Sequence, residues 1–185
     1  MAKTPKHEIK LGLYFDLIKI DKVVVKKQLF EEMCKKGCRN YNNKYSCPPY
    51  SPEFFSYVKN TNCLLVVLLK ADLEQPTFSS YPDHHKLRVG NAVIKPRIEK
   101  LMREMEKEFG GKFLSTGACR LCKPCKRKLG EACKHPEKMR FSLESLGVDC
   151  NKLSEDVFDM PLFWYKEKTA PKYTCVICAL PLEDD

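Results

Sequence analysis

Four cysteines within fifteen residues constrain this chain more than any other feature of its sequence. They occur in segment 117–136, which reads G-A-C-R-L-C-K-P-C-K-R-K-L-G-E-A-C-K-H-P. Cys119, Cys122 and Cys125 have the spacing C-x2-C-x2-C, and Cys133 follows eight residues later. Such spacing brings three thiolates around one compact loop, which is the arrangement that a cubane iron–sulfur cluster needs. The segment therefore predicts a metal-binding loop.

A [4Fe-4S] cluster held by Cys119, Cys122, Cys125 and Cys133 is the first interpretation of this loop. The bacterial ferredoxin run C-x2-C-x2-C-x3-C-P agrees at the first three positions and differs at the fourth. Zinc is the alternative metal, but zinc sites usually take their cysteines in two separated pairs. Here three cysteines come in close succession, which favours the iron–sulfur cluster. The third interpretation is a loop of thiols that bind no metal.

A second group of cysteines lies nearer the N-terminus. Cys34 and Cys38 have a spacing that places side chains on one face of a helical turn, and Cys47 follows in S-C-P-P-Y-S-P. The two prolines after Cys47 hold the chain extended and remove two backbone donors. Three thiolates are one short of a cubane, so Cys63 or a later cysteine completes the shell, or one iron is open to water or substrate. The alternative is a set of buried thiols beside a proline turn.

The number of cysteines and the hydropathy of the sequence indicate in which cellular compartment the protein is expected. The chain has 11 cysteines, an odd number, and its first residues contain no apolar signal segment. Free or metal-bound thiols in a reducing cytoplasm are therefore expected, in place of disulfides. No run approaches the roughly 20 apolar residues that span a bilayer, so no membrane association is expected. The length fits a single metal-binding domain over residues 1–185.

The formal net charge is +9, from 33 basic and 24 acidic residues. Basic residues gather around the four-cysteine loop, at Arg120, Lys123, Lys126, Arg127, Lys128, Lys134, Lys138 and Arg140. Three interpretations of these basic residues are open. They balance the charge of a cluster on a solvated loop, they dock an acidic redox partner protein, or they contact RNA phosphates. RNA is not favoured, because residues 118–140 contain no aromatic side chain that could stack on bases.

Hydrophobic patterning predicts an α/β fold, with α+β as the alternative. Strands are expected within 8–26, at 63–69 and at 172–182, and the apolar run 63–69 is typical of a central strand buried on both faces. Helices are expected at 27–38 and 85–109, with Pro96 either kinking the second helix or starting another. Residues 112–116 predict a short strand, which would complete a parallel βαβ unit in a small open sheet. The loop-rich cysteine region would leave that strand at its C-terminal end.

The remaining candidate residues have weaker patterns. Cys150 is expected to be structural, and Cys175 and Cys178 would face opposite sides of a strand although they form C-x2-C. Glu144 and Asp149 are acidic residues near the motifs, and we expect them to cap helices or to pair with Arg140.

Two ordered motifs resemble a family of uncharacterised, cysteine-rich, predicted metal-binding proteins from anaerobic archaea and bacteria. The first motif comprises Cys34, Gly37, Cys38, Tyr41, Ser46-Cys47-Pro48-Pro49-Tyr50 and Pro52. The second comprises Gly117, Cys119, Cys122, Cys125, Cys133, Pro136, Arg140, Ser142, Glu144 and Gly147-Val148-Asp149. The resemblance implies metal or iron–sulfur binding in an anaerobic cytoplasm and no particular reaction. Cys150, Cys175 and Cys178 depart from the family pattern.

Three functions are compatible with these patterns. The first is an electron-transfer protein whose [4Fe-4S] cluster, alone or with a second one, serves a redox partner protein. The second is an enzyme in which a three-cysteine cluster leaves one iron open, for sulfur transfer or a dehydration. The third is an adaptor for RNA or protein in which zinc holds the fold.

Overall fold

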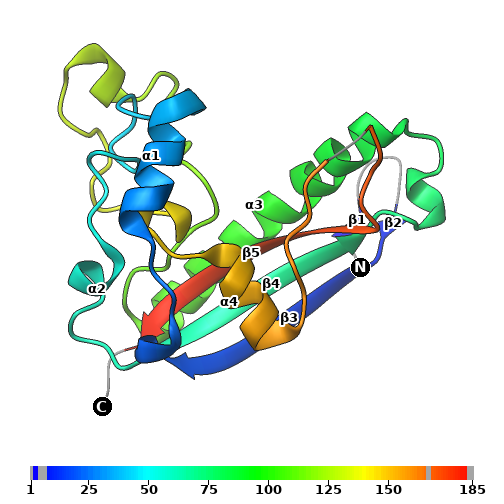
Figure 1. Cartoon of the computed structure of the whole chain (residues 1–185), viewed down its shortest axis with the longest axis horizontal. Helices are drawn as coiled ribbons and strands as arrows, with labels where there is room; N and C mark the ends of the chain where they lie inside the picture. Colours follow the sequence, from blue (N-terminus) through cyan, green and yellow to red (C-terminus); the bar gives the residue numbers. More distant parts are fainter. Residues whose placement is uncertain (1, 4–7, 166–167, 183–185) are drawn as a thin grey trace.

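A three-stranded antiparallel sheet forms the centre of the computed structural model, which describes residues 2–3, 8–165 and 168–182 (Figure 1). The strands are β3 (Leu11–Lys19), β4 (Cys63–Asp72) and β5 (Tyr173–Leu182), in the order β3-β4-β5. β4 lies between the other two, and its apolar residues on both faces are buried, as its sequence predicts. Short strands β1 (Ala2–Lys3) and β2 (Glu8–Ile9) pair in a separate sheet.

Four α-helices accompany the sheet in the described part of the chain: α1 (Lys27–Gly37), α2 (Phe54–Tyr57), α3 (Asp83–Phe109) and α4 (Cys150–Phe158). Four short 3-10 helices join them: η1 (Ile20–Lys22), η2 (Pro76–Phe78), η3 (Lys126–Leu129) and η4 (Glu144–Leu146). The side chains of α3 pack on one face of β4 and β5, and Leu153 of α4 packs on the other face. Among the described residues, no helix is both long and apolar enough to cross a membrane.

The long helix α3 continues through Pro96, so no second helix starts there. A proline inside a helix removes one hydrogen bond and crowds the preceding turn. Beside this proline, the guanidinium of Arg97 donates to the carbonyl of Val93 at 2.8 Å. On the sheet side, Ile94, Ile98 and Met102 are fully buried, which confirms the apolar face expected from the helical spacing.

The mixed class and the small open sheet are confirmed, but the βαβ unit is not formed as predicted. All three strands of the sheet are antiparallel, and residues 112–116 make only isolated bridges, from Leu114 to Ala179 and from Ser115 to Ser142. Because Leu114 pairs antiparallel with β5, this segment runs in the direction of β4, with β5 between the two. The parallel pair is therefore split by a strand from the end of the chain, which local sequence patterns do not reveal.

Both cysteine segments lie at one end of the sheet (Figure 1). There α1, the loop after it and the loop after Leu114 form a lobe with little regular structure. A buried core beneath this lobe includes Phe54, Leu114, Leu143 and Val148. The lobe is thus held on the sheet by apolar contacts from several loops.

Candidate metal centre

The four cysteines of the 117–136 loop line a single pocket. Cys119, Cys122, Cys125 and Cys133 are all partly buried in its wall. The loop owes its shape to a turn at Gly117 with φ 74° and to η3, which ends at Gly130 with φ 74°. Both values lie in the left-handed region that glycine adopts without strain. The structure thus brings together the four side chains that the spacing selects.

The wall of this pocket includes residues from the N-terminal cysteine segment. Tyr45 and Ser46 line it beside the four thiols. The ammonium of Lys44 donates to the carbonyl of Cys119 at 2.6 Å, and the hydroxyl of Tyr45 donates to the carbonyl of Glu131 at 2.8 Å. The guanidinium of Arg127 lies 4.5 Å from the ring centre of Tyr50. The two cysteine segments are therefore docked against each other although they are far apart in sequence.

Cys34, Cys38 and Cys47 form a second group of neighbouring thiols. Cys34 lies near the end of α1, Cys38 follows the helix, and Cys47 is buried in the next loop. Burial, with smaller contributions from Cys38 and Cys34, raises the pKa of Cys47 to about 11, although Ser46 and Lys44 lower it. Burial and then Cys38 also raise the pKa of Cys34. The three side chains are therefore near enough to act on one another electrostatically.

Cys63 lies elsewhere in the fold. It pairs with Lys19 and Leu182 at the end of the central sheet, and it lines a different pocket beside Asp21. The thiols that act on the pKa of Cys47 are those of Cys38 and Cys34. The N-terminal group is therefore a set of three thiols.

The donor chemistry of the four-cysteine pocket fits a soft metal. Burial raises the pKa of Cys119; the amide of Leu121 and the ammonium of Lys44 lower it, and Cys125 and Cys133 raise it. Neighbouring thiolates repel one another, and the positive charge of a bound metal offsets that repulsion and so favours the deprotonated ligands. In the described part of the chain, no three His, Cys, Asp or Glu side chains converge on one ion position. The four thiolates of a cubane bind four different irons, so they surround a shared volume.

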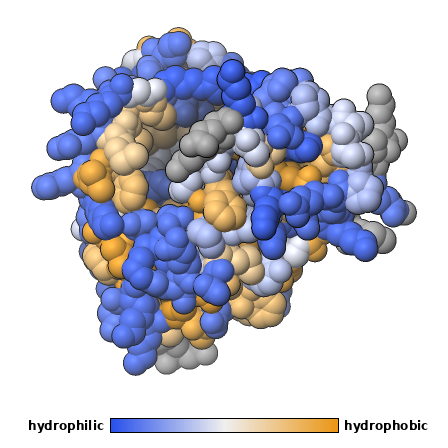
Figure 2. Space-filling model, turned by 45° about the vertical axis from the view of Figure 1, so that its right-hand side comes forward, coloured by the Kyte–Doolittle hydropathy of each residue, from blue (hydrophilic) through white to orange (hydrophobic). Residues whose placement is uncertain are grey.

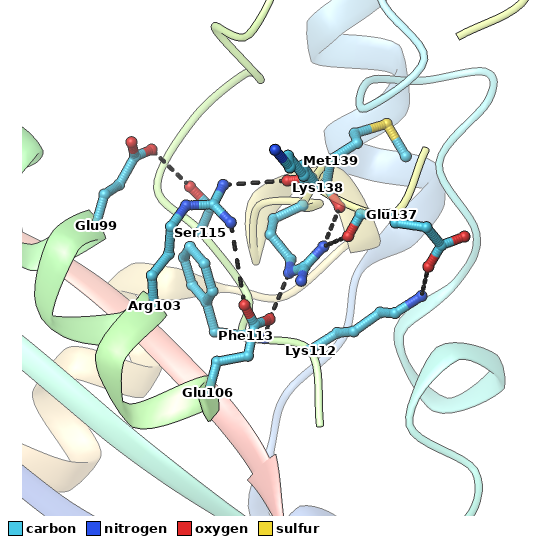
Figure 3. Close-up of polar contacts among 10 residues, drawn as sticks. Glu99, Arg103, Glu106, Lys112, Phe113, Ser115, Glu137, Lys138 and Met139 are labelled. Carbon is cyan, nitrogen blue, oxygen red and sulfur yellow. Dashed lines mark hydrogen bonds and ion pairs between the residues drawn. The ribbon is translucent and has the colours of Figure 1, made fainter. Parts of the chain in front are cut away.

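A buried ion pair holds the end of the cysteine loop on α3 (Figure 3). The guanidinium of Arg140, which is 8% exposed, donates through Nε to Glu106 Oε1 at 2.5 Å. The same carboxylate oxygen accepts from the amide of Phe113 at 2.9 Å. Arg140 also donates to the carbonyls of Glu137 and Met139, which closes the turn after Cys133. Glu106 was not identified from the sequence, because it lies 34 residues from Arg140 on a helix rich in charges.

The start of α1 is fixed by a turn that ends at Gly147. Lys26 donates its amide to the carbonyl of Gly147 at 2.7 Å, and the ammonium of Lys27 donates to the carbonyl of Ser145 at 2.7 Å and to Ser51. Gly147 has φ 94°, and a Cβ there would lie 2.6 Å from the Cα of Lys27. Because backbone approaches backbone this closely, only glycine fits. This contact sets the direction in which α1 carries Cys34.

Asp149 and Glu144 are the two acidic residues near the cysteine motifs, and their roles differ from the pairing with Arg140 that the sequence suggested. Asp149 caps α4 by accepting from the amide of Lys152 at 3.1 Å, as expected, and it pairs with Lys26 at 2.9 Å. The expected pairing of these acidic residues with Arg140 is wrong, because Arg140 bonds to Glu106. Glu144 belongs to η4 and contributes its charge near Cys34.

All eleven cysteines are free thiols. Cys150 begins α4 and is buried in the core, which agrees with a structural role. Cys175 and Cys178 lie opposite Lys70 and Val67 of β4 and so face opposite sides of β5, as predicted. Burial raises the pKa of Cys178 well above that of an ordinary thiol. These three cysteines are separate from the two groups described above.

Comparison with known proteins identifies a family for this chain. No curated protein and no solved structure matches the chain. A family described as predicted metal-binding protein (DUF2284) matches residues 16–180, a range that contains both cysteine groups and the whole central sheet except the first residues of β3 and the end of β5. The protein therefore belongs to this family of predicted metal-binding proteins.

Proposed function

We propose that the chain binds a [4Fe-4S] cluster through Cys119, Cys122, Cys125 and Cys133 and transfers single electrons to a partner protein. The observation that supports this proposal is the shared pocket, because the four thiols with ferredoxin-like spacing line one cavity. Membership in a metal-binding family supports the metal, and the close succession of three thiols favours the cluster over zinc.

The surroundings of the pocket suit an anionic group. Lys126 and Lys134 line it, and Lys44 lies near both Cys119 and Cys47. Their positive charges would offset the negative charge that thiolates and sulfide bring into a partly buried volume. A bound cluster supplies reversible one-electron transfer, with a potential set by hydrogen bonds to sulfur and by burial. The chain itself would hold the cluster, shield it from water and fix these hydrogen bonds.

The surface around the pocket has the features of a small docking site. Leu121 is 42% exposed and Leu129 is 52% exposed, and both belong to the cysteine loop. Basic residues flank these leucines in the sequence. Figure 2 shows hydrophobic patches separated by hydrophilic residues over one side of the molecule. Transient redox complexes use small interfaces in which charge guides the encounter. An acidic redox protein is the partner that fits.

The three-thiol group favours a second candidate function. Cys34, Cys38 and Cys47 would ligate three irons of a cubane, and the fourth iron would be available to water or substrate. Such an open position is where a metal site acts as a Lewis acid. The protein would then be an enzyme in which the open iron would bind and polarise a substrate, for sulfur transfer or a dehydration.

The deciding experiment measures iron, acid-labile sulfide and zinc in protein purified without oxygen. We expect about four irons and four sulfides per chain if one group is loaded and about eight of each if both are loaded. Cys122→Ala should remove the cluster of the four-cysteine pocket, and Cys47→Ala should remove only a cluster of the second group. A colourless protein that contains zinc and no iron would contradict the proposal.

Electron transfer is tested on the iron-loaded protein by redox titration with electron paramagnetic resonance detection. We expect a reversible one-electron signal that Cys122→Ala abolishes. Electron transfer to an acidic carrier protein should slow as salt is raised, because surface charges are screened. Iron that dissociates irreversibly on reduction would contradict a carrier and favour the enzyme.

A further inference from the structure

Among the residues that the structure describes, strand β3 has no strand paired to its outer side, and several of its exposed side chains are apolar. Leu13, Phe15 and Leu17 are 49%, 69% and 54% exposed. Their partners on β4 are Leu69, Val67 and Leu65. Paired residues point to the same face of a sheet, and this is the face on which α3 packs. Because α3 covers β4 and β5, the apolar row on β3 is left beside the helix without a cover.

The backbone of β3 is also open on this edge. The amide of Ile20 donates to Asn62 at 2.9 Å, and the amide and carbonyl of Lys10 bond to the side chain of Gln75, beyond the end of β4. Even-numbered residues therefore direct their backbone groups toward β4. Backbone direction alternates along a strand, so the odd-numbered residues, including Leu13 and Phe15, direct theirs outward. The amide of Leu17 bonds to the Asp16 carboxylate at 2.8 Å, which agrees with this direction.

A nine-residue edge with apolar side chains and outward backbone groups is a template for another strand. We propose that β3 pairs with β3 of a second copy of this chain, antiparallel, about a two-fold axis at Leu13. The central sheets of the two copies then form one continuous sheet. The proposal is independent of which metal the cysteines bind.

The charged residues in and next to β3 indicate that a second copy of this chain pairs with the strand, and they indicate the register of that pairing. With the axis at Leu13, Lys10 of one copy lies opposite Asp16 of the other, and symmetry produces this pair twice. With the axis at Tyr14, Asp16 would lie opposite Gly12, and with the axis at Phe15 it would lie opposite Tyr14. Only the first of these registers joins opposite charges. Both residues are exposed in the chain as described and are therefore available for the contact.

In the register with the axis at Leu13, apolar residues of β3 in one copy lie opposite apolar residues of β3 in the other copy. Leu13 lies opposite Leu13 of the second copy, and Leu11 lies opposite Phe15. These odd-numbered pairs exchange backbone hydrogen bonds, while Lys10 and Asp16 form the closer pair that lacks them. Both α3 helices then lie on the same face of the joined sheet. The apolar row fills the groove between them, which gives a closed interface that uses one surface twice.

Sedimentation velocity over a micromolar concentration series tests the proposal. We expect the native chain to sediment as a dimer and Phe15→Glu to sediment as a monomer, because the substitution places charge in the centre of the interface. Phe109→Glu is the matched control: Phe109 is 60% exposed at the end of α3, away from β3. It should remain dimeric. Circular dichroism and metal content should be unchanged in both variants.

A charge exchange tests the register. Asp16→Lys places lysines opposite each other and should weaken the dimer by about tenfold. The double variant Lys10→Asp with Asp16→Lys restores opposite charges and should restore dimerisation. A native chain that stays monomeric, or Phe15→Glu and Phe109→Glu variants that behave alike, would overturn the proposed dimer. A double variant as weak as Asp16→Lys would overturn the register.

Discussion

The backbone amide of Cys119 donates a hydrogen bond to the hydroxyl of Ser46 at 3.0 Å. Since an amide can only donate, the hydroxyl oxygen is the acceptor, and its own hydrogen is available to the sulfur of Cys47 at 3.9 Å. Ser46 is 1% exposed, so water does not compete for these bonds. One buried hydroxyl therefore joins the two cysteine groups.

Replacing this hydroxyl should affect both groups. Ser46→Ala leaves a buried amide without its acceptor, so we expect the metal-free protein to lose about 1–3 kcal/mol of unfolding free energy in urea. In the loaded protein the reduction potential should fall, because a hydrogen bond near sulfur is lost. Ser80→Ala changes an exposed serine and is the control. Equal effects of the two substitutions would show that the Ser46 contact contributes nothing.

Glu106→Gln should destabilise the protein by about 3 kcal/mol, because it leaves the Arg140 guanidinium buried without a carboxylate. The free energy of unfolding in urea measures this loss. Glu104→Gln is the matched control on the same helix, since Glu104 lies 3.9 Å from Lys100 and both side chains are exposed. Its change should stay below about 0.5 kcal/mol. A small change at Glu106 would mean that the ion pair does not anchor the cysteine loop.

Gly147→Ala should cost about 2 kcal/mol or more, because alanine has to adopt φ 94° and its Cβ would collide with the backbone of Lys27. Thermal and urea unfolding both measure this loss. Gly130→Ala separates the two causes, since Gly130 has φ 74° but no atom lies within 4 Å of a Cβ built there. We expect Gly130→Ala to cost less. Equal losses would show that backbone conformation, and not the contact with Lys27, is the whole cause.

Alkylation of the metal-free folded protein should distinguish the cysteines. Cys38 is exposed and should react first, whereas Cys178 is fully buried and should be spared. Burial raises the pKa of Cys175 to about 11 although Lys70 lowers it, so its reaction should accelerate as the pH approaches that value. Mass spectrometry of the peptides reports each site, and unfolded protein is the control. Modification of Cys178 as fast as Cys38 would contradict the fold around β5.

Much of the fold and of the candidate site follows from short-range patterns. The apolar run at 63–69 predicted a central strand, and helical spacing predicted α1 and α3 with nearly correct ends. The spacing of Cys119, Cys122 and Cys125 selected three residues that line one pocket with Cys133. The predictions of the strand and the two helices are confirmed because a few adjacent residues decide backbone periodicity. The metal-ligand role of the cysteines stays a prediction.

The two parallel segments of the βαβ unit are not neighbours in the sheet, because strand order is a long-range property. β5 comes from the end of the chain and occupies the place beside β4, so the segment 112–116 contacts the far side of β5. The contacts of Glu106 with Arg140 and of Gly147 with Lys27 were equally hidden. Each joins residues far apart in sequence, and no local pattern marks such partners.

The residue types and their spacing alone indicate a metal-binding loop: they place thiols at a spacing typical of metal sites, with basic residues around them, in a chain that matches a family of predicted metal-binding proteins. That the two cysteine segments are in contact is seen only in the folded chain, because Ser46 and Cys119 are 73 residues apart. The fold also separates Cys63 from these segments and, among the described residues, leaves the outer side of β3 unpaired. Ligand type is a property of single residues, whereas proximity depends on how the whole chain buries its apolar surface.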